Sequence, residues 1–286
     1  MHVPDVRTRL GVLPTSTRPI VMGVCNVTPD SFSDGGRYLD VDAAVAAGLK
    51  MVADGAEVVD VGGESTRPGA EPVEVDVELA RVLPVVSALA AEGVCVSIDT
   101  VKAPVAAAAV EAGAALVNDV SSALLDPDMV PVVASLGVPY VLTHLKGTPR
   151  TMQDDPRYDD VVTEVVDHLA ARIEVLVAAG VDQDRIVVDP GIGFGKRVEH
   201  NLALLARLDA LTVLGRPVLV GVSRKRFIGA ITGVAAPADR LAGSLAAASV
   251  AVAAGARIVR AHDVAATVQA VKVAWAITAT RTPADR

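Results

Sequence analysis

The sequence predicts an α/β protein made of a single-domain (β/α)8 barrel of the TIM type. Eight short runs rich in Val and Ile alternate with Ala-rich stretches of helical length along the 286 residues. Continuous apolar runs of this length are typical of strands that are buried on both faces, as in a parallel sheet. Each run closes on a polar residue, and in a barrel the carboxyl ends of all strands meet at the face where active sites lie.

The eight expected strands follow one another at intervals that leave room for a helix. In chain order, the polar residues that end them are Asn26, Asp60, Asp99, Asn118 with Asp119, His144, Asp189, Ser223 with Lys225, and Arg260 with His262. Before six of the runs a helix is expected to end in a left-handed glycine, and these are Gly55, Gly93, Gly113, Gly137, Gly180 and Gly255. An open doubly wound sheet is the alternative, but no G-x-G-x-x-G follows the first strand.

Length and composition favour one domain. We expect a loose N-terminal segment over residues 1–18, the barrel over 19–280 and a C-terminal tail over 281–286. The longest uncharged run, between Arg240 and Arg257, is too short to cross a bilayer, so we expect it to form a helix packed closely on the barrel. The N-terminus lacks the apolar core of a signal peptide, which predicts a cytoplasmic protein with no membrane partner.

Charge and cysteine content argue against further classes. The net charge is −8, and the chain has no basic stripe and only 2% aromatic residues, so nucleic-acid binding is not expected. Cys25 and Cys95 both lie in predicted strands. They are expected to be buried, reduced thiols rather than disulfide or metal-binding residues.

The loop after the first strand, residues 26–36, is dense in oxygen-bearing side chains and ends in two glycines. Such a loop can supply oxygen ligands to Mg²⁺, which usually keeps several waters and shares a substrate phosphate. Turn chemistry alone would explain Thr28 to Ser31, but it would not explain Asn26 at the strand end or Phe32 within the loop. We therefore favour a functional loop.

The loop after the second strand reads GGESTRPG, residues 62–69. Glycines allow a backbone to approach a ligand closely, and an arginine between hydroxyl groups and a proline suits a phosphate or diphosphate. A flexible loop with an incidental surface arginine is the alternative.

Three strands end in groups that suit a flat nitrogen heterocycle carrying an amine. Asp99 and Asp189 would supply hydrogen-bond acceptors, and Asn118 an amide with both a donor and an acceptor. Each aspartate alone could equally be a helix N-cap. Asp60 lies between two valines and is expected to support the barrel rather than to contact a substrate.

The last two strands lead into basic residues. The segment SRKRFIG, residues 223–229, and then Arg260 and His262 lie where phosphate-binding barrels usually hold an anion, which fits an anionic leaving group. Arg260 and His262 are two residues apart and therefore on the same side of an extended strand. A solvated charge run is the alternative for residues 224–226, and His144 is either a ligand or a barrel-wall residue.

All three phenylalanines, Phe32, Phe194 and Phe227, are expected in loops at the active face. In a chain so poor in aromatic residues, this placement suggests a planar apolar co-substrate near the mouth of the barrel. Packing within a loop is the alternative for any one of them.

These motifs together resemble those of the dihydropteroate synthases. The segments that carry the resemblance occur in order between residues 20 and 270: GVCNVTPDSFSDGG, GAEVVDVGGESTRPGA, VSIDT, VNDVS, GTPRTMQDDPRYDDV, DPGIGFGK, VGVSRKRFIG and RAHDV. The resemblance implies an alkyl transferase of folate synthesis. Such an enzyme condenses 6-hydroxymethyl-7,8-dihydropterin diphosphate with p-aminobenzoate and gives 7,8-dihydropteroate and diphosphate.

The resemblance also implies roles for individual residues. The pterin would be held by Asp99, Asn118, Asp189 and Lys225, and Mg²⁺ by Asn26. The residues implied around the diphosphate are Thr66, Arg67, Arg260 and His262. Those implied around the p-aminobenzoate slot, where sulfonamides compete in this family, are Pro68, Phe194, Ser223 and Lys225. Asp34 would help to order the closed site, and the implied catalytic residues are Asp34, Arg67, Asp99 and Lys225.

The sequence departs from the family pattern at two places. Thr143 stands where a methionine is common before the histidine of the fifth strand, which predicts a more polar floor under the pterin. Ser122 and Ala123 replace two glycines after the fourth strand, which predicts a different path for that loop. Neither change removes a charged site residue, so activity is expected to be retained.

Two related functions fit less well. A corrinoid-linked pterin methyltransferase would share the barrel and its acidic residues, but it should lack the SFSDGG and SRKRFIG segments that are present here. A non-catalytic pterin-binding paralogue is disfavoured because the charged residues of the implied diphosphate site are intact. The family is typically dimeric through the side that contains residues 241–279, so a homodimer is expected.

Overall fold

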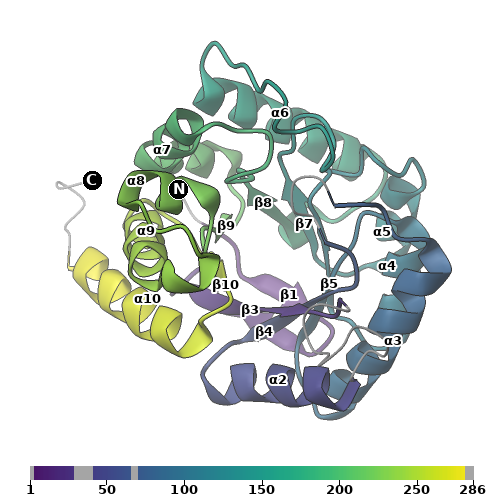
Figure 1. Ribbon diagram of the computed structural model, residues 1–286. Coiled ribbons are helices and arrows are strands. Elements are labelled where there is room, and N and C mark those ends of the chain that lie inside the picture. Colours follow the sequence, from purple (N-terminus) through teal and green to yellow (C-terminus); the bar gives the residue numbers. More distant parts are fainter. Residues whose placement is uncertain (1–2, 29–40, 66–69, 281–286) are drawn as a thin grey trace.

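Eight parallel strands form a barrel that confirms the predicted fold class (Figure 1). The computed structural model describes residues 3–28, 41–65 and 70–280. The strands are β3 (Ile20–Asn26), β4 (Val58–Gly62), β5 (Val96–Asp99), β6 (Leu116–Asp119), β7 (Tyr140–Thr143), β8 (Ile186–Asp189), β9 (Leu219–Gly221) and β10 (Ile258–Ala261). Their order is β8-β7-β6-β5-β4-β3-β10-β9, and a parallel bridge between Val188 and Val218 joins the two ends of the sheet.

Helices form a ring around the strands (Figure 1). They are α2 (Val41–Ala53), α3 (Val75–Ala91), α4 (Ala103–Glu111), α5 (Met129–Leu136), α6 (Val161–Ala178), α7 (Val198–Ala206), α8 (Arg226–Thr232), α9 (Leu241–Ala253) and α10 (Val264–Ala279). Short 3-10 helices are η1 (Gln183–Arg185), η2 (Leu208–Leu214) and η3 (Pro237–Asp239). The main apolar core lies between this ring and the outer face of the strands.

The six glycines predicted to end helices all have positive φ, which confirms that prediction. The angles are 102° at Gly55, 76° at Gly93, 121° at Gly113, 61° at Gly137, 98° at Gly180 and 108° at Gly255. At Gly113 a side chain is also excluded sterically, because a Cβ added there would lie 2.4 Å from the Cβ of Ala90. These turns return the chain from each helix to the next strand, so that the strand ends all reach one face.

Part of the segment expected to be loose is an antiparallel hairpin of β1 (Val6–Thr8) and β2 (Gly11–Leu13). Val6 and Leu13 are buried and pack with Ile20, Met22 and other residues from the starts of the strands. In Figure 1 the hairpin lies behind the strands. The hairpin therefore covers the amino-terminal end of the barrel. Its contacts remove from water the apolar side chains at the starts of the strands, which is stabilising.

The uncharged run before Arg257 forms α9, as predicted. A Cβ added at Gly243 would lie 2.3 Å from Cγ2 of Ile228, so the missing side chain lets α9 approach α8 closely. Within the described ranges, no helix combines the length and apolar character needed to cross a bilayer.

Candidate active site

Three predicted site residues lie in one row at the carboxyl ends of neighbouring strands. Asn26 of β3 is in register with Gly62 of β4, Gly62 with Asp99 of β5, and Asp99 with Asn118 of β6. A Cβ added at Gly62 would lie 3.3 Å from the Cβ of Asp99, so the glycine leaves room for the aspartate. Asn26, Asp99 and Asn118 thus share one level of the barrel mouth.

Arg260 of β10 reaches across the mouth to two carboxylates. Its Nε donates to Oδ2 of Asp60 at 2.6 Å, and its Nη2 donates to Oδ2 of Asp99 at 2.6 Å. Asn118 donates to the same Asp60 oxygen at 2.9 Å. Asp60 is fully buried, so its expected supporting role agrees with these contacts. The pairing of Arg260 with both acids was not predicted.

Burial shifts both acidic site residues towards their neutral forms. Burial raises the pKa of Asp99 to about 7, although the charge of Arg260 opposes the shift. The pKa of Asp189 is raised by burial to about 6, against a hydrogen bond of 2.7 Å from the backbone N–H of Gly191. Both carboxyls therefore change protonation close to neutral pH. Such groups suit hydrogen bonding to a heterocycle that carries N–H donors.

Lys225 and Phe194, two residues implied around the p-aminobenzoate slot, are in contact with each other. The Nζ atom of Lys225 is 4.1 Å from the centre of the Phe194 ring, which is a cation–π contact. Burial lowers the pKa of Lys225 to about 8, and the charge of Asp189 opposes this. The ammonium is thus close to both an aromatic ring and a site carboxylate, where it can hold a planar ligand or lose its proton at modestly alkaline pH.

Ser223 and His262 are hydrogen-bonded to each other. Oγ of Ser223 lies 3.0 Å from Nδ1 of His262 and accepts from the His262 backbone N–H at 3.2 Å. Burial, with the nearby charges of Arg260 and Arg224, lowers the pKa of His262 to about 4. The imidazole is therefore neutral at pH 7 in this structure. An anion placed beside it would favour its protonated form.

Two expectations for the segment after β9 change. Arg224 is not a solvated charge, because its guanidinium pairs with Asp263 at 2.6 and 3.0 Å and its backbone N–H donates to Ser244. Phe227 is not in a loop at the active face; that prediction was wrong. It is the second residue of α8 and is buried in the core, because the helix begins directly after Lys225.

Sequence reasoning missed Lys196, which is buried beside the site. Its Nζ lies 2.8 Å from Nδ1 of His144 and 2.9 Å from the carbonyl oxygen of Phe194. Burial lowers the pKa of Lys196 to about 7. His144 is thereby a buried wall residue bonded to a lysine. The signal was present in the sequence, because the lysine directly follows the glycine-rich turn after Asp189.

The two departures from the family pattern lie side by side. Ser122 and Ala123 are both left-handed, with φ of 60° and 56°, and Oγ of Ser122 donates to the carbonyl oxygen of Thr143 at 2.5 Å. Asp119 holds this turn by accepting from the backbone N–H groups of Ser121 and Ala123. The hydroxyl of Thr143 is buried and has no hydrogen-bond partner among the described residues.

Four of the predicted site residues fall outside the described ranges. They are Asp34, Thr66, Arg67 and Pro68. Among the residues that the structure does describe, no group of three His, Cys, Asp or Glu side chains could hold a metal ion.

The site geometry agrees with what comparison with known proteins finds. The family model described as pterin binding enzyme matches residues 22–262. The chain is 51% identical to the dihydropteroate synthase of Mycobacterium leprae over 263 residues, which cover 89% of this chain and 93% of that one. The chain belongs to the dihydropteroate synthase family of pterin-binding enzymes.

Solved structures of the same family have the same fold. The dihydropteroate synthase of Xanthomonas albilineans with 4-aminobenzoic acid superposes with a TM-score of 0.91 at 48% identity, over 98% of this chain and 100% of that one. The same enzyme in complex with 7,8-dihydropteroate gives a TM-score of 0.87 at 46% identity, over 97% and 100% of the two chains. This pterin-binding enzyme is therefore a transferase with the fold expected from its sequence.

Proposed function

We propose that this chain condenses 6-hydroxymethyl-7,8-dihydropterin diphosphate with p-aminobenzoate at the barrel mouth, giving 7,8-dihydropteroate and diphosphate. The observation that carries the proposal is the convergence of Asp99, Asn118, Arg260 and Asp60, which strand register and hydrogen bonds bring together. In a family member, this cluster is a ready set of acceptors and donors for a pterin.

The pterin would lie against the acidic side of the mouth. Asp99 and Asp189 would accept hydrogen bonds from its ring N–H and amine, and Asn118 would use its amide. Asp99 would also balance the positive charge that develops on the pterin methylene group as diphosphate departs. Asn118 is already oriented by its hydrogen bond to Asp60, so little side-chain ordering remains for the ligand to provide.

The diphosphate would face the basic side. Arg260 and His262, with Thr66 and Arg67, would meet the growing negative charge on the leaving group. Mg²⁺, when bound, would add positive charge there, and the amide oxygen of Asn26, a hard donor at the end of β3, fits the one or two protein ligands that Mg²⁺ commonly takes. Asp34 would help to order the closed site.

The p-aminobenzoate would occupy a slot beside the pterin methylene group. Lys225, Phe194, Ser223 and Pro68 would border it, and the Lys225–Phe194 contact supplies one flat wall and one cation for a benzoate. The aniline nitrogen is a weak nucleophile, so attack would follow departure of diphosphate in a pocket that excludes water. The electrons of its lone pair form the new C–N bond in place of the broken C–O bond to diphosphate, and its proton would pass to solvent when the pocket reopens. Sulfonamides would compete for this slot.

The first test is to measure diphosphate release and dihydropteroate formation by the purified chain given the pterin diphosphate and Mg²⁺, with and without p-aminobenzoate. We expect both products together, and their loss in Lys225→Ala. Lys50→Ala is the control, because Lys50 is an exposed residue of α2 whose ion pair within the described part of the chain is with Asp54, one helical turn away. Tight pterin binding without turnover would instead indicate a paralogue without the reaction. Methyl transfer from a methylated pterin would indicate the methyltransferase.

We also propose that the chain forms a homodimer through α9 and α10. Val250, Val273 and Ile277 are large apolar side chains on these helices that are more than half exposed in the single chain. The measurement is the mass in solution by light scattering, with Val273→Asp as the disrupting variant.

A cytoplasmic location and the domain limits 1–18, 19–280 and 281–286 are further parts of the proposed function. Cell fractionation checks the location, and limited proteolysis checks the domain limits.

A further inference from the structure

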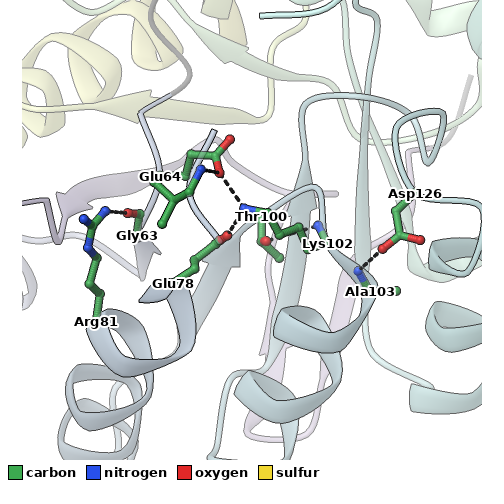
Figure 2. Close-up of polar contacts among 9 residues, drawn as sticks. Gly63, Glu64, Glu78, Arg81, Thr100, Lys102, Ala103 and Asp126 are labelled. Carbon is green, nitrogen blue, oxygen red and sulfur yellow. Dashed lines mark hydrogen bonds and ion pairs between the residues drawn. The ribbon is translucent and has the colours of Figure 1, made fainter. Parts of the chain in front are cut away.

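Lys102, Glu64 and Glu78 form an ion-pair cluster at the edge of the mouth, outside the residues used above. Nζ of Lys102 lies 2.5 Å from Oε2 of Glu64 and 2.5 Å from Oε2 of Glu78. Figure 2 shows the lysine between the two carboxylates, which come from the chain after β4 and from α3. One ammonium thus serves two acids from different parts of the chain.

The three side chains of the cluster are largely buried, which restricts the positions that their charged groups can take. The side chain of Glu78 is 1% exposed, and those of Lys102 and Glu64 are 18% and 16% exposed. Oε1 of Glu78 has no hydrogen-bond partner among the described residues, and within the same residues Lys102 is the cation that pairs with this carboxylate, at Oε2. A buried charge pair adds little net stability compared with apolar residues, but it fixes the relative placement of the groups that form it.

Further contacts tie the cluster to the chain that leaves β4. Oε2 of Glu64 also accepts a hydrogen bond from the backbone N–H of Val73 at 2.9 Å. This carboxylate therefore joins two points of the chain that lie on either side of residues 66–69. Arg81 of α3 donates to the carbonyl oxygen of Gly63 at 2.8 Å (Figure 2). The chain is therefore held just before and just after residues 66–69.

The same lysine is fixed to the end of β5. Its backbone N–H donates to Oγ1 of Thr100 at 3.2 Å, and the next residue, Ala103, donates its N–H to Asp126 at 2.7 Å. Lys102 is the N-cap residue that directly precedes α4, three positions after Asp99. The cluster thus connects the entrance of the second loop to the strand that carries a proposed pterin ligand.

We propose that Lys102 is a positioning residue, which fixes Glu64, and through Glu64 the backbone at Val73, relative to Asp99 by holding Glu64 against Glu78. It acts through Glu64, and it does not itself touch the substrates. The inference rests on the proposed function to the extent that Thr66 and Arg67, which follow Glu64 in the chain, serve the diphosphate and Pro68 borders the p-aminobenzoate slot. A fixed entrance is what such a loop needs, because small misplacements of reacting groups reduce turnover strongly.

The test compares Lys102→Met with Lys102→Arg and with the neutral triple variant Lys102→Met, Glu64→Gln, Glu78→Gln. Lys50→Met is the matched control, since it also removes a lysine from a double contact with a carboxylate, on α2. Three quantities are measured: hydrogen exchange of the Val73 amide, kcat/KM for p-aminobenzoate, and affinity for 6-hydroxymethylpterin, which lacks the diphosphate.

In Lys102→Met we expect faster exchange at Val73 and a fall in kcat/KM of about tenfold or more, with pterin affinity changed less than about threefold. Lys102→Arg should keep most of the turnover. The triple variant removes the uncompensated charge, so it should unfold at a temperature near that of the parent while its turnover stays low.

Normal kcat/KM and normal Val73 exchange in Lys102→Met would overturn the proposal. So would full turnover in the triple variant, because the lysine would then be needed only to neutralise charge. If Lys102→Met does not fold, the triple variant decides. Failure of the parent chain to make dihydropteroate would overturn the proposed function, and Val73 exchange would still decide whether Lys102 fixes the loop.

Discussion

At the scale of single residues, the mouth of the barrel concentrates buried charge. Arg260 serves Asp60 and Asp99, and Lys102 serves Glu64 and Glu78, so each cation compensates two carboxylates. Removing water from such groups is unfavourable unless each keeps its partner. The site is therefore sensitive to loss of a single partner, and the pKa of Asp99, which burial raises to about 7, lies where a ligand can shift it.

Arg260→Met should lower the free energy of unfolding by about 3 to 5 kcal/mol at neutral pH, because two buried carboxylates lose their partner. The folded pKa of Asp99 already lies above its ordinary value and would rise further without the arginine. The loss should therefore be largest above that pKa and become smaller as the pH falls and Asp99 is protonated. Urea unfolding across pH checks this.

Arg207→Met is the control for that measurement, since Arg207 pairs with Asp160 on the surface. Its free energy of unfolding should change little. An Arg260→Met loss that is independent of pH would show that the arginine acts by packing and not through Asp99.

Pterin affinity should pass through a maximum with pH. Asp189 and Asp99, with pKa values of about 6 and about 7, must be ionised to accept from pterin N–H groups, so affinity should rise with pH through that range. Lys225, with a pKa of about 8, should lose its proton above that value and weaken binding again. Calorimetric titration of 6-hydroxymethylpterin over this range measures it. An affinity that falls steadily from acid to neutral pH would contradict the assignment of these carboxylates as acceptors.

At the scale of elements, α8 links packing to the site. The helix begins directly after Lys225, and its Ile228 contacts α9 at Gly243. A displacement of α8 would therefore carry Lys225 with it. We therefore expect a change in the packing of α8 on α9 to move the lysine relative to Phe194.

Gly243→Ala tests this packing. Helix propensity alone predicts stabilisation by about 1 kcal/mol. Because the new Cβ would lie 2.3 Å from Cγ2 of Ile228, we instead expect destabilisation by about 1 to 3 kcal/mol. Turnover should fall as well. In chemical denaturation, the double variant Gly243→Ala, Ile228→Ala should lose less free energy of unfolding than the sum of the losses in the two single variants. Strict additivity would mean that the two side chains do not compete for space.

At the scale of the whole molecule, the two ends of the barrel have different tasks. The carboxyl ends of the strands carry the polar site, whereas the β1–β2 hairpin covers the amino-terminal end with Val6 and Leu13. Stability and chemistry are thus separated along the barrel axis.

Val6→Ala should lower the free energy of unfolding by about 2 kcal/mol and leave kcat unchanged, because Val6 is fully buried at the end far from the site. Val12→Ala in the same hairpin is the matched control; its side chain is 58% exposed and should matter little. Thermal unfolding and steady-state kinetics measure both. A fall in kcat with Val6→Ala would show that the two ends are coupled.

The sequence predicts those features that are local patterns. The eight strands and their six glycine turns follow from apolar runs and from a backbone that only glycine adopts readily. The β1–β2 hairpin was missed because its strands have three residues each, too few for an alternating pattern. Lys102 was missed because its partner Glu78 lies 24 residues away in the chain, and the contact of Lys196 with His144 was missed because these two residues are 52 positions apart. Phe227 was misplaced because α8 begins at Arg226, which makes Phe227 a helical residue and not a loop residue.

Closure of the barrel depends on its last strand, since β10 pairs with β3 on one side and with β9 on the other. During synthesis on a ribosome, β3 therefore remains an edge strand until Ile258–Ala261 has emerged. Its free backbone groups can pair with other nascent chains in that interval. A chain truncated before this strand should consequently aggregate and should not be a partly active enzyme. Ribosomes that stall late on this messenger RNA should likewise release or hold chains that need chaperones to stay unaggregated.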